Sequence, residues 1–451
     1  MRSVDLFRPM LNLFLRGLAV SLCFACLAAP SSFSGSVVDA TTGKPIADAI
    51  VTAGSTVTRT DANGVFRIDA ADTAVSARAY GYSRTRIAAD GRGSAALQLK
   101  LTPLIPRALY LSFWAAGTPS IRESALRLAR TTPVNAVVID VKGDLGYVCF
   151  RTALPLATEI GAQKIITVPD MPALLDRLHK QGIYTIARIV TFKDNLLGTA
   201  RPKLALHQNG KVFKDREGLV WCDPFLPDVQ AYNVALAVEA AKAGFDEIEF
   251  DYVRFPHAKG VEFSQPSTEE SRPKTITAFL RQAREKLIPF NVFLSADVFG
   301  YICWNRGDTG IGQKLEDLAG VLDYISPMLY PSGFMYGIPN YRDPVAHPYE
   351  IVRLSLERAR ERTKLDPIRF RPWLQAFADY TFDKRQFGAE EIRAQIRAAQ
   401  TFGSDGWLLW NPRNVYSADM IRSAEPERRL APGSDAGFSG RSPKIGESSV
   451  C

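Results

Sequence analysis

The chain has 451 residues, and its composition is that of a folded protein rather than a disordered one. Hydrophobic residues make up 46% of the sequence and aromatic residues 10%, which is enough apolar material for a large core. Six cysteines and four histidines are too few for a disulfide scaffold or a histidine-rich metal centre. The net charge of +8 is modest, and arginines dispersed along predicted helices such as 353–362 do not indicate nucleic-acid binding.

Residues 1–30 have the pattern of a secretory signal peptide. Arg2, Arg8 and Arg16 precede an apolar run over 18–29, and small residues follow it. This run is shorter than the roughly 20 residues that span a bilayer, and we find no longer apolar run elsewhere. We therefore expect an exported protein, periplasmic or secreted, with an uncleaved N-terminal anchor as the alternative.

Residues 33–102 are predicted to form a small all-β domain, because short strand-like runs alternate with turn residues there. Three motifs resemble the carboxypeptidase regulatory-like domain, a small β-sandwich: Gly35-x-Val37-x-Asp39, Gly43-Lys44-Pro45-Ile46 and Thr60-Asp61-x-Asn63-Gly64-x-Phe66. The resemblance implies an accessory module without catalytic residues. Structural spacing is its expected role, and binding of sugar or protein is the alternative.

From 105 to 425 the pattern changes to strands alternating with amphipathic helices. Eight such strands indicate a (β/α)8 TIM barrel, so the expected fold class is α/β with a small all-β sandwich in front. A doubly wound open sheet is the alternative, but no glycine-rich phosphate loop follows the first strand. Residues 427–451 are rich in Gly, Ser and Pro, which predicts a disordered tail. The predicted strands cover 108–114, 136–141, 184–191, 247–253, 292–299, 324–330, 371–377 and 406–410.

Polar residues gather at the carboxyl ends of these strands, where barrel enzymes place their chemistry. Glycosidic bond cleavage requires two carboxyl groups, one to attack or stabilise the oxocarbenium ion and one to protonate the leaving oxygen. Asp251 and Asp297, on adjacent strand ends, are the predicted pair, with Asp251 as nucleophile or charge stabiliser and Asp297 as general acid/base. The candidate substrate-binding residues are Asp140, Lys142, Arg188, Glu249, Tyr252, Arg254, Trp304, Tyr330, Gln375, Trp410 and Asn411.

An alternative interpretation of the charged residues is structural. Asp140, Lys142, Arg188, Glu249 and Asp251 could instead form an ion-pair network that holds the barrel interior. The tryptophans favour a saccharide site, since flat aromatic rings cover the apolar faces of sugars. All six lie in the barrel region. Trp304 and Trp410, at or beyond strand ends, are the two predicted to form a flat surface for the sugar.

Several segments of the barrel region resemble a bacterial family of uncharacterised predicted glycoside hydrolases. The match covers about 107–415 and includes 186–194, 244–256, 325–332, 371–377 and 406–411. It implies a barrel related to α-amylase-like and α-galactosidase-like hydrolases, whose fourth strand ends in a nucleophilic Asp, here Asp251. The resemblance is less direct for the general acid/base residue, because amylase-like enzymes have Glu where this chain has Asp297. A family Pro-Ser-His pattern reads Pro331-Ser332-Gly333 here.

The sequence therefore predicts a glycoside hydrolase acting on a cell-envelope or environmental polysaccharide, without cofactor or metal. Two alternatives stay open: a catalytically silent glycan-binding protein, and a metal-dependent hydrolase, against which the absence of a strand-end histidine cluster argues. Cys149, Cys222, Cys303 and Cys451 could form a disulfide in an oxidising compartment, with no pairing favoured. We expect no nucleic-acid partner.

Overall fold

The computed structural model describes residues 31–70, 72–88 and 96–422. The predicted signal peptide at 1–30 and the predicted tail at 427–451 lie outside these residues.

The N-terminal part is all-β, as the turn-rich pattern predicts. Strands alternate buried and exposed residues, most clearly in β4, so that Phe66 and Ile68 point into the core. Val37, Val51 and Leu99 complete this small core, and the resemblance to a regulatory-like domain stays a prediction. One sheet has the order β4 (Val65–Ala70), β1 (Ser31–Asp39), β7 (Leu97–Leu101), and the other β3 (Thr56–Arg59), β2 (Ile50–Ala53), β5 (Ala74–Arg78), β6 (Thr85–Ala88).

Parallel strands of the following region close into a barrel, which confirms the predicted TIM-like fold and excludes the open sheet. Each apolar run of the sequence supplies one strand. Around the barrel these are β8 (Arg107–Leu111), β9 (Ala136–Lys142), β10 (Tyr184–Val190), β13 (Glu247–Asp251), β15 (Phe293–Phe299), β16 (Tyr324–Met328), β17 (Trp373–Gln375) and β18 (Trp407–Trp410).

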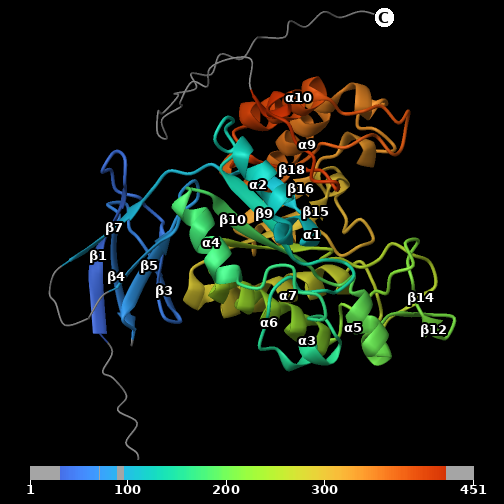
Figure 1. Ribbon diagram of the computed structural model, residues 1–451, viewed down its shortest axis with the longest axis horizontal. Coiled ribbons are helices and arrows are strands. Elements are labelled where there is room, and N and C mark those ends of the chain that lie inside the picture. Colours follow the sequence, from blue (N-terminus) through green and yellow to red (C-terminus); the bar gives the residue numbers. More distant parts are fainter. Residues whose placement is uncertain (1–30, 71, 89–95, 423–451) are drawn as a thin grey trace, which may run out of the picture.

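Helices surround the barrel and bury their apolar faces against the outward side of its strands (Figure 1). On β13, Ile248 and Phe250 belong to this outer core, so Glu247, Glu249 and Asp251 face the barrel interior. The main helices are α2 (Pro119–Leu128), α4 (Met171–Lys180), α6 (Pro227–Ala243), α7 (Ser271–Leu287), α9 (Pro348–Thr363) and α10 (Ala389–Phe402), with the shorter α1 (Phe113–Gly117), α3 (Pro155–Glu159), α8 (Leu315–Ala319) and α11 (Ala418–Ile421).

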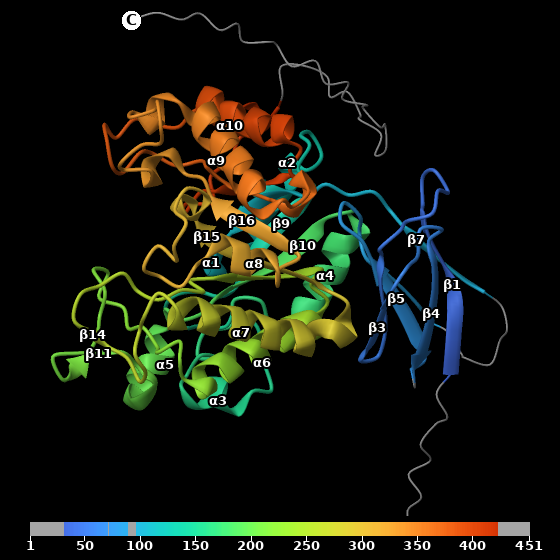
Figure 2. The ribbon, with the colours of Figure 1, turned by 180° about the vertical axis from the view of Figure 1, so that it is seen from behind.

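The N-terminal sheets pack against the amino end of the barrel strands. Arg84 forms an ion pair with Asp246 at 3.1 Å and donates to the carbonyl oxygens of Gly244, Phe245 and Phe290. All four residues directly precede β13 or β15, so the β module closes the end of the barrel opposite the expected site. Figure 2 shows this arrangement from behind.

Loops after β10 and β13 extend the opposite, carboxyl end of the barrel. They carry α5 (Asn195–Ala200) and a small sheet of β12 (Lys211–Val212), β11 (His207–Gln208) and β14 (Val261–Glu262). Among the described residues, no helix has the length and apolar character needed to cross a membrane.

Candidate active site

Arg188 lies at the centre of a carboxylate cluster inside the barrel. Strand pairing places it beside Asp140 of β9 and Glu249 of β13. Its Nη1 donates to Asp140 Oδ1 at 2.5 Å, its Nε donates to Asp251 Oδ2 at 3.0 Å, and its Nη2 also donates to Asp251 Oδ2. Asp297 Oδ2 lies 3.6 Å from the same Nε. One guanidinium therefore contacts carboxyl groups from three strands. The two residues of the predicted pair, Asp251 and Asp297, lie next to each other around it.

Asp297 is fixed from a second side by Trp373. The indole Nε1 of this residue, on β17, donates to Asp297 Oδ1 at 2.6 Å. Both side chains are buried. The orientation of the Asp297 carboxyl is therefore set by β17 across the barrel, as well as by its own strand.

Glu249 and Asp297 form a buried carboxyl pair. Burial first, and then the charge of Glu247, raise the pKa of Glu249 to about 7. Burial first, and then the charges of Glu249 and Asp251, raise the pKa of Asp297 well above its usual range. No described donor lies within hydrogen-bond distance of either oxygen of Glu249. Burial of the two neighbouring carboxyl groups therefore favours the protonated form of the pair.

Asp251 is in a different electrostatic environment. It accepts two hydrogen bonds from Arg188 and one from its neighbour, since the backbone N–H of Tyr252 lies 2.5 Å from Asp251 Oδ1. These contacts fix the orientation of the Asp251 carboxyl group. Tyr252 adopts a left-handed conformation (φ 48°), which turns the chain sharply at the end of β13 and lets its N–H reach back to the carboxylate.

Aromatic rings line the other side of Arg188. Trp410 stacks on Tyr110 with ring centroids 3.9 Å apart, and the guanidinium carbon of Arg188 lies 4.8 Å from the Trp410 ring. The Tyr110 hydroxyl donates to Asp140 Oδ2 at 2.5 Å. Trp410 is partly exposed. Of the two tryptophans predicted to bind the sugar, it is the one that lies beside the carboxylates. Tyr330 is close enough to the cluster to interact with it, because burial first, and then the charges of Asp297 and Asp251, raise the pKa of its hydroxyl group.

A second ion-pair network lies deeper in the barrel. Arg371 binds Glu247 Oε2 at 2.6 Å and Asp405 Oδ2 at 2.6 Å. Tyr184 and Ser295 donate to the same glutamate at 2.9 Å and 2.5 Å. All five residues are buried, and each charged group has a partner of opposite charge. This layer fits the structural interpretation and supports the cluster above it.

Some predicted site residues lie apart from the cluster. Lys142 faces outward: Val141 is an extra residue in the pairing of β9 with β10, so Lys142 aligns with Ile189, and its Nζ binds Asp194 at 2.7 Å and Asn233 at 2.8 Å. Trp304 also lies outside the barrel, where its Nε1 donates to Ser355 of α9 at 2.9 Å.

Gln375 and Asn411 sit at strand ends, but their side chains are committed to the protein. The amide of Gln375 bonds Ser332 and the carbonyl oxygen of Phe377. The amide nitrogen of Asn411 donates to the carbonyl oxygens of Ala376 and Val415. These two residues shape the loops around the mouth.

Sequence reasoning did not assign a site role to Tyr110 or Trp373. The two-residue alternation of β8 puts Tyr110 inside the barrel, and that signal was available in the sequence. The contact between Trp373 and Asp297 joins residues 76 positions apart, and no local pattern reports it.

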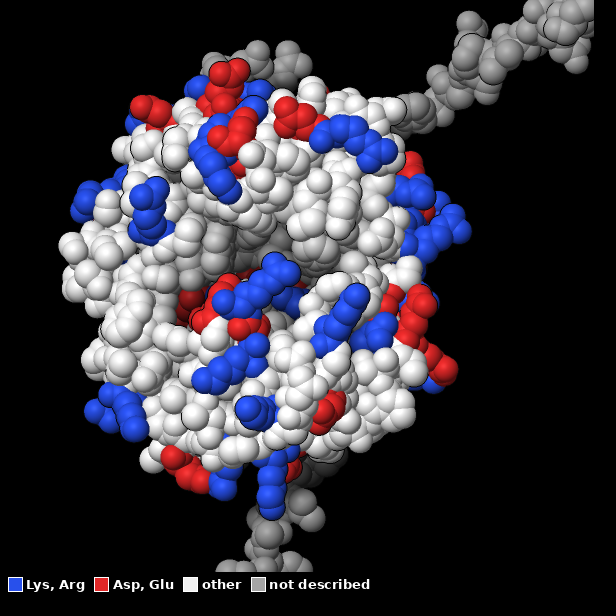
Figure 3. Space-filling view, turned by 90° about the vertical axis from the view of Figure 1, so that its right-hand side faces the viewer, with Lys and Arg blue, Asp and Glu red and all other residues white. Residues whose placement is uncertain are grey.

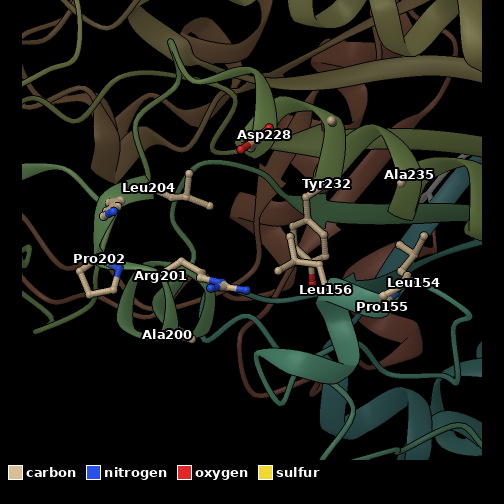
Figure 4. A pocket seen from close by; sticks show the side chains of 12 residues that line it. Leu154, Pro155, Leu156, Ala200, Arg201, Pro202, Leu204, Asp228, Tyr232 and Ala235 are labelled. Carbon is tan, nitrogen blue, oxygen red and sulfur yellow. The ribbon is translucent and has the colours of Figure 1, made fainter.

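The mouth of the barrel opens on the face that carries α5, β12 and β14. Figure 3 looks onto this face and shows a central hollow with acidic atoms visible inside it. A separate cavity of about 710 Å³ lies outside the barrel wall, between α3, α5 and α6. Figure 4 shows that Tyr232, Leu156, Leu204 and Arg201 line it, and the only carboxylate among its lining residues is Asp228. It lacks the carboxyl pair that hydrolysis requires.

No group of three or more His, Cys, Asp or Glu side chains in the described part of the chain is placed to hold a metal ion. Cys149, Cys222 and Cys303 are buried and free, so the disulfide left open by the sequence does not form among these three.

A family model described as "Putative glycosyl hydrolase domain" matches residues 108–416. A search of curated proteins found no match. Among solved structures, a hypothetical protein from Ruminiclostridium thermocellum is 39% identical, covering 42% of this chain and 97% of that one, with a TM-score of 0.38.

The glycoside hydrolase domain of PgaB (BpsB) from Bordetella bronchiseptica has a TM-score of 0.51 at 14% identity, covering 71% of this chain and all of that domain. This likeness supports the barrel fold. A Group IV chitinase from Ostrinia furnacalis is 11% identical, covering 68% of this chain and 92% of that one, with a TM-score of 0.42.

Proposed function

This chain belongs to that glycosyl hydrolase family over residues 108–416, and on this premise we propose that it cleaves a polysaccharide with Asp251 and Asp297 as its carboxyl pair. One observation carries the assignment. Both carboxyl groups lie within 3.6 Å of Arg188 Nε, yet the protein treats them differently. Asp251 accepts two hydrogen bonds from Arg188, whereas burial and neighbouring charges raise the pKa of Asp297 and of Glu249 above their usual ranges.

The two environments match the two roles of glycosidic cleavage. Asp297 transfers its proton to the leaving oxygen as the glycosidic bond breaks, and the Asp251 carboxylate attacks or stabilises the anomeric carbon. Asp297, now ionised, then removes a proton from the water that completes hydrolysis. The adjoining placement of the two carboxyl groups favours retention of configuration, which requires the shorter separation of about 5–5.5 Å.

The remaining contacts position the sugar and the carboxyl groups. Trp373 holds Asp297, and Tyr110 holds Asp140 against Arg188. Trp410 offers a partly exposed ring beside the carboxylates, as a surface for the apolar face of a sugar. A polysaccharide of the cell envelope or the environment is the expected substrate if the predicted signal segment exports the protein.

The test is a panel of bacterial and plant polysaccharides, scored by release of reducing ends. We compare the wild type with Asp251→Asn and Asp297→Asn, and with Asp176→Asn as a matched control on α4, where the carboxylate is exposed and pairs with Lys180. Wild type and control should release sugar, and the two site variants should not. If the wild type binds a glycan without releasing reducing ends, and Asp251→Asn behaves identically, the protein is a glycan-binding protein and the proposal fails.

A further inference from the structure

Arg254 is a cation at the barrel mouth whose charge the protein leaves unmatched. It follows Asp251 by three residues, and its guanidinium carbon lies 4.9 Å from the Trp221 ring and 5.1 Å from the Tyr252 ring. Its one hydrogen bond among the described residues runs from Nη1 to the carbonyl oxygen of Phe255 at 3.2 Å. No described carboxylate lies within ion-pair distance of it, although the charges of Asp251 and Asp215 reach it.

Three buried cations of the barrel, in contrast, are paired with carboxylates. Arg188 contacts three aspartates, and Arg371 binds Glu247 and Asp405. Lys193, at the end of β10, pairs with Asp144, Asp215 and Glu217. Burial lowers the pKa of Arg254, so its charge is partly desolvated without a compensating carboxylate. Such an arrangement costs stability unless a ligand supplies the anion.

The side chain is also held in place for recognition. Trp221 Nε1 donates to Asp215 at 3.0 Å, which fixes the indole beneath the guanidinium. The rings of Trp221 and Tyr252 lie against the guanidinium group. Its remaining N–H donors lie along its edge, where they can bind a planar anion. A carboxylate accepts two parallel hydrogen bonds from that edge, a geometry that arginine matches and lysine does not.

Further cations without an ion-pair partner among the described residues lie along the rim of the barrel mouth. Lys214 pairs through its backbone with Val220, next to Trp221. Lys211, Lys214, Arg216 and Lys259 are exposed and have no ion pair in the described part of the chain. Figure 3 shows Lys and Arg side chains gathered beside the hollow, on the half of this face where α5, β12 and β14 lie.

We propose that the substrate is an acidic glycan of the polyuronate class, with the carboxylate of a sugar unit near the cleaved bond bound to Arg254 and further carboxylates along the rim. This inference rests on the proposed hydrolase function for its turnover, but the binding part stands separately. A neutral glycan leaves the Arg254 guanidinium without an ion-pair partner, whereas the carboxylate of a uronate neutralises its charge.

The experiment uses matched polymers. Polygalacturonate, alginate and hyaluronate are each compared with their carboxyl-reduced form, which keeps the backbone and removes the charge. Affinity and kcat/KM are measured for the wild type, Arg254→Gln, Arg254→Lys and the double variant Lys214→Gln/Arg216→Gln, with Asp176→Asn as control. Thermal unfolding of each variant shows whether it folds.

The wild type should bind at least one acidic polymer about tenfold or more tightly than its reduced form, the gain expected from hydrogen bonds to a charged group. Arg254→Gln should lose that difference, and Arg254→Lys should recover only part of it. The double variant should weaken binding and make it less sensitive to salt. Equal binding of acidic and reduced polymers, or a preference that survives in Arg254→Gln, overturns the inference. Preferential binding of an acidic polymer without cleavage of any polymer leaves the inference standing and overturns the hydrolase function.

Discussion

Glu249 and Asp297 are buried carboxyl groups on neighbouring barrel strands, and burial raises the pKa of both. Glu249 aligns with Ser295, two residues before Asp297, so both side chains point inward from adjacent positions. Two such carboxyl groups cannot both ionise in a buried site without a large cost. Arg188 donates hydrogen bonds to Asp251 and Asp140, but its Nε lies 3.6 Å from Asp297 Oδ2. Asp297 is therefore the aspartate of the cluster that the guanidinium stabilises least.

The first prediction concerns stability and pH. Burial raises the pKa of Glu249 from 4.5 to about 7, so between these values the folded protein holds a proton that the unfolded chain releases. The stabilisation is complete below pH 4.5 and is lost as the pH rises through about 7. Glu249→Gln should flatten this part of the curve of melting temperature against pH. Identical pH dependence in wild type and variant would show that Glu249 is not protonated in the folded state.

The second prediction assigns the two catalytic roles. Loss of a general acid costs roughly 10²–10⁴ in rate, so Asp297→Ala should lose this much on a natural glycan and far less on a substrate whose leaving group needs no proton. Asp251→Ala should lose activity on both substrates. Azide should restore turnover in each variant, with opposite anomeric configuration in the two products. The same loss on both substrates for Asp297→Ala would remove the acid role from this residue.

The third prediction concerns Arg188 as the organiser of the cluster. Arg188→Met leaves Asp140 and Asp251 buried without their cation, and removal of one partner from a buried ion pair costs about 3–5 kcal/mol. Urea unfolding should show a loss of this size, together with loss of activity. Arg358→Gln is the control, because this partly exposed arginine pairs with Glu361 one helical turn away. A variant as stable as the wild type would mean that the carboxyl groups are not ionised in the folded protein.

The fourth prediction separates the two tryptophans that the sequence marked as sugar platforms. Trp410→Ala removes the ring beside Arg188 and should raise KM several-fold with a smaller change in kcat, in keeping with about 0.5–1.5 kcal/mol for an aromatic contact. Trp304→Ala should lower the melting temperature and leave KM unchanged, because its indole contacts α9 outside the barrel. A KM effect from Trp304→Ala alone would reverse the assignment.

The sequence was sufficient to predict the fold and to place the three acidic residues of β13 on one face of the strand. Apolar runs alternating with amphipathic helices predict a layer of parallel strands covered by helices, and eight such strands form the closed barrel. The two-residue period of a strand places Glu247, Glu249 and Asp251 on one face whatever their neighbours are. These properties are local, so a single strand contains all the information needed.

The tertiary structure decided which charges meet. Arg188 and Lys142 are equally polar at neighbouring strand ends, yet the extra residue Val141 turns Lys142 outward to Asp194 and leaves Arg188 with the carboxylates. Trp373 holds Asp297 across 76 positions of sequence, and Arg254 keeps an unmatched charge because no described carboxylate approaches within ion-pair range. Strand register, bulges and loop paths follow from packing over the whole barrel. The pKa values and roles of the acids depend on these long-range contacts, because burial and the nearest opposite charge set the protonation of each group.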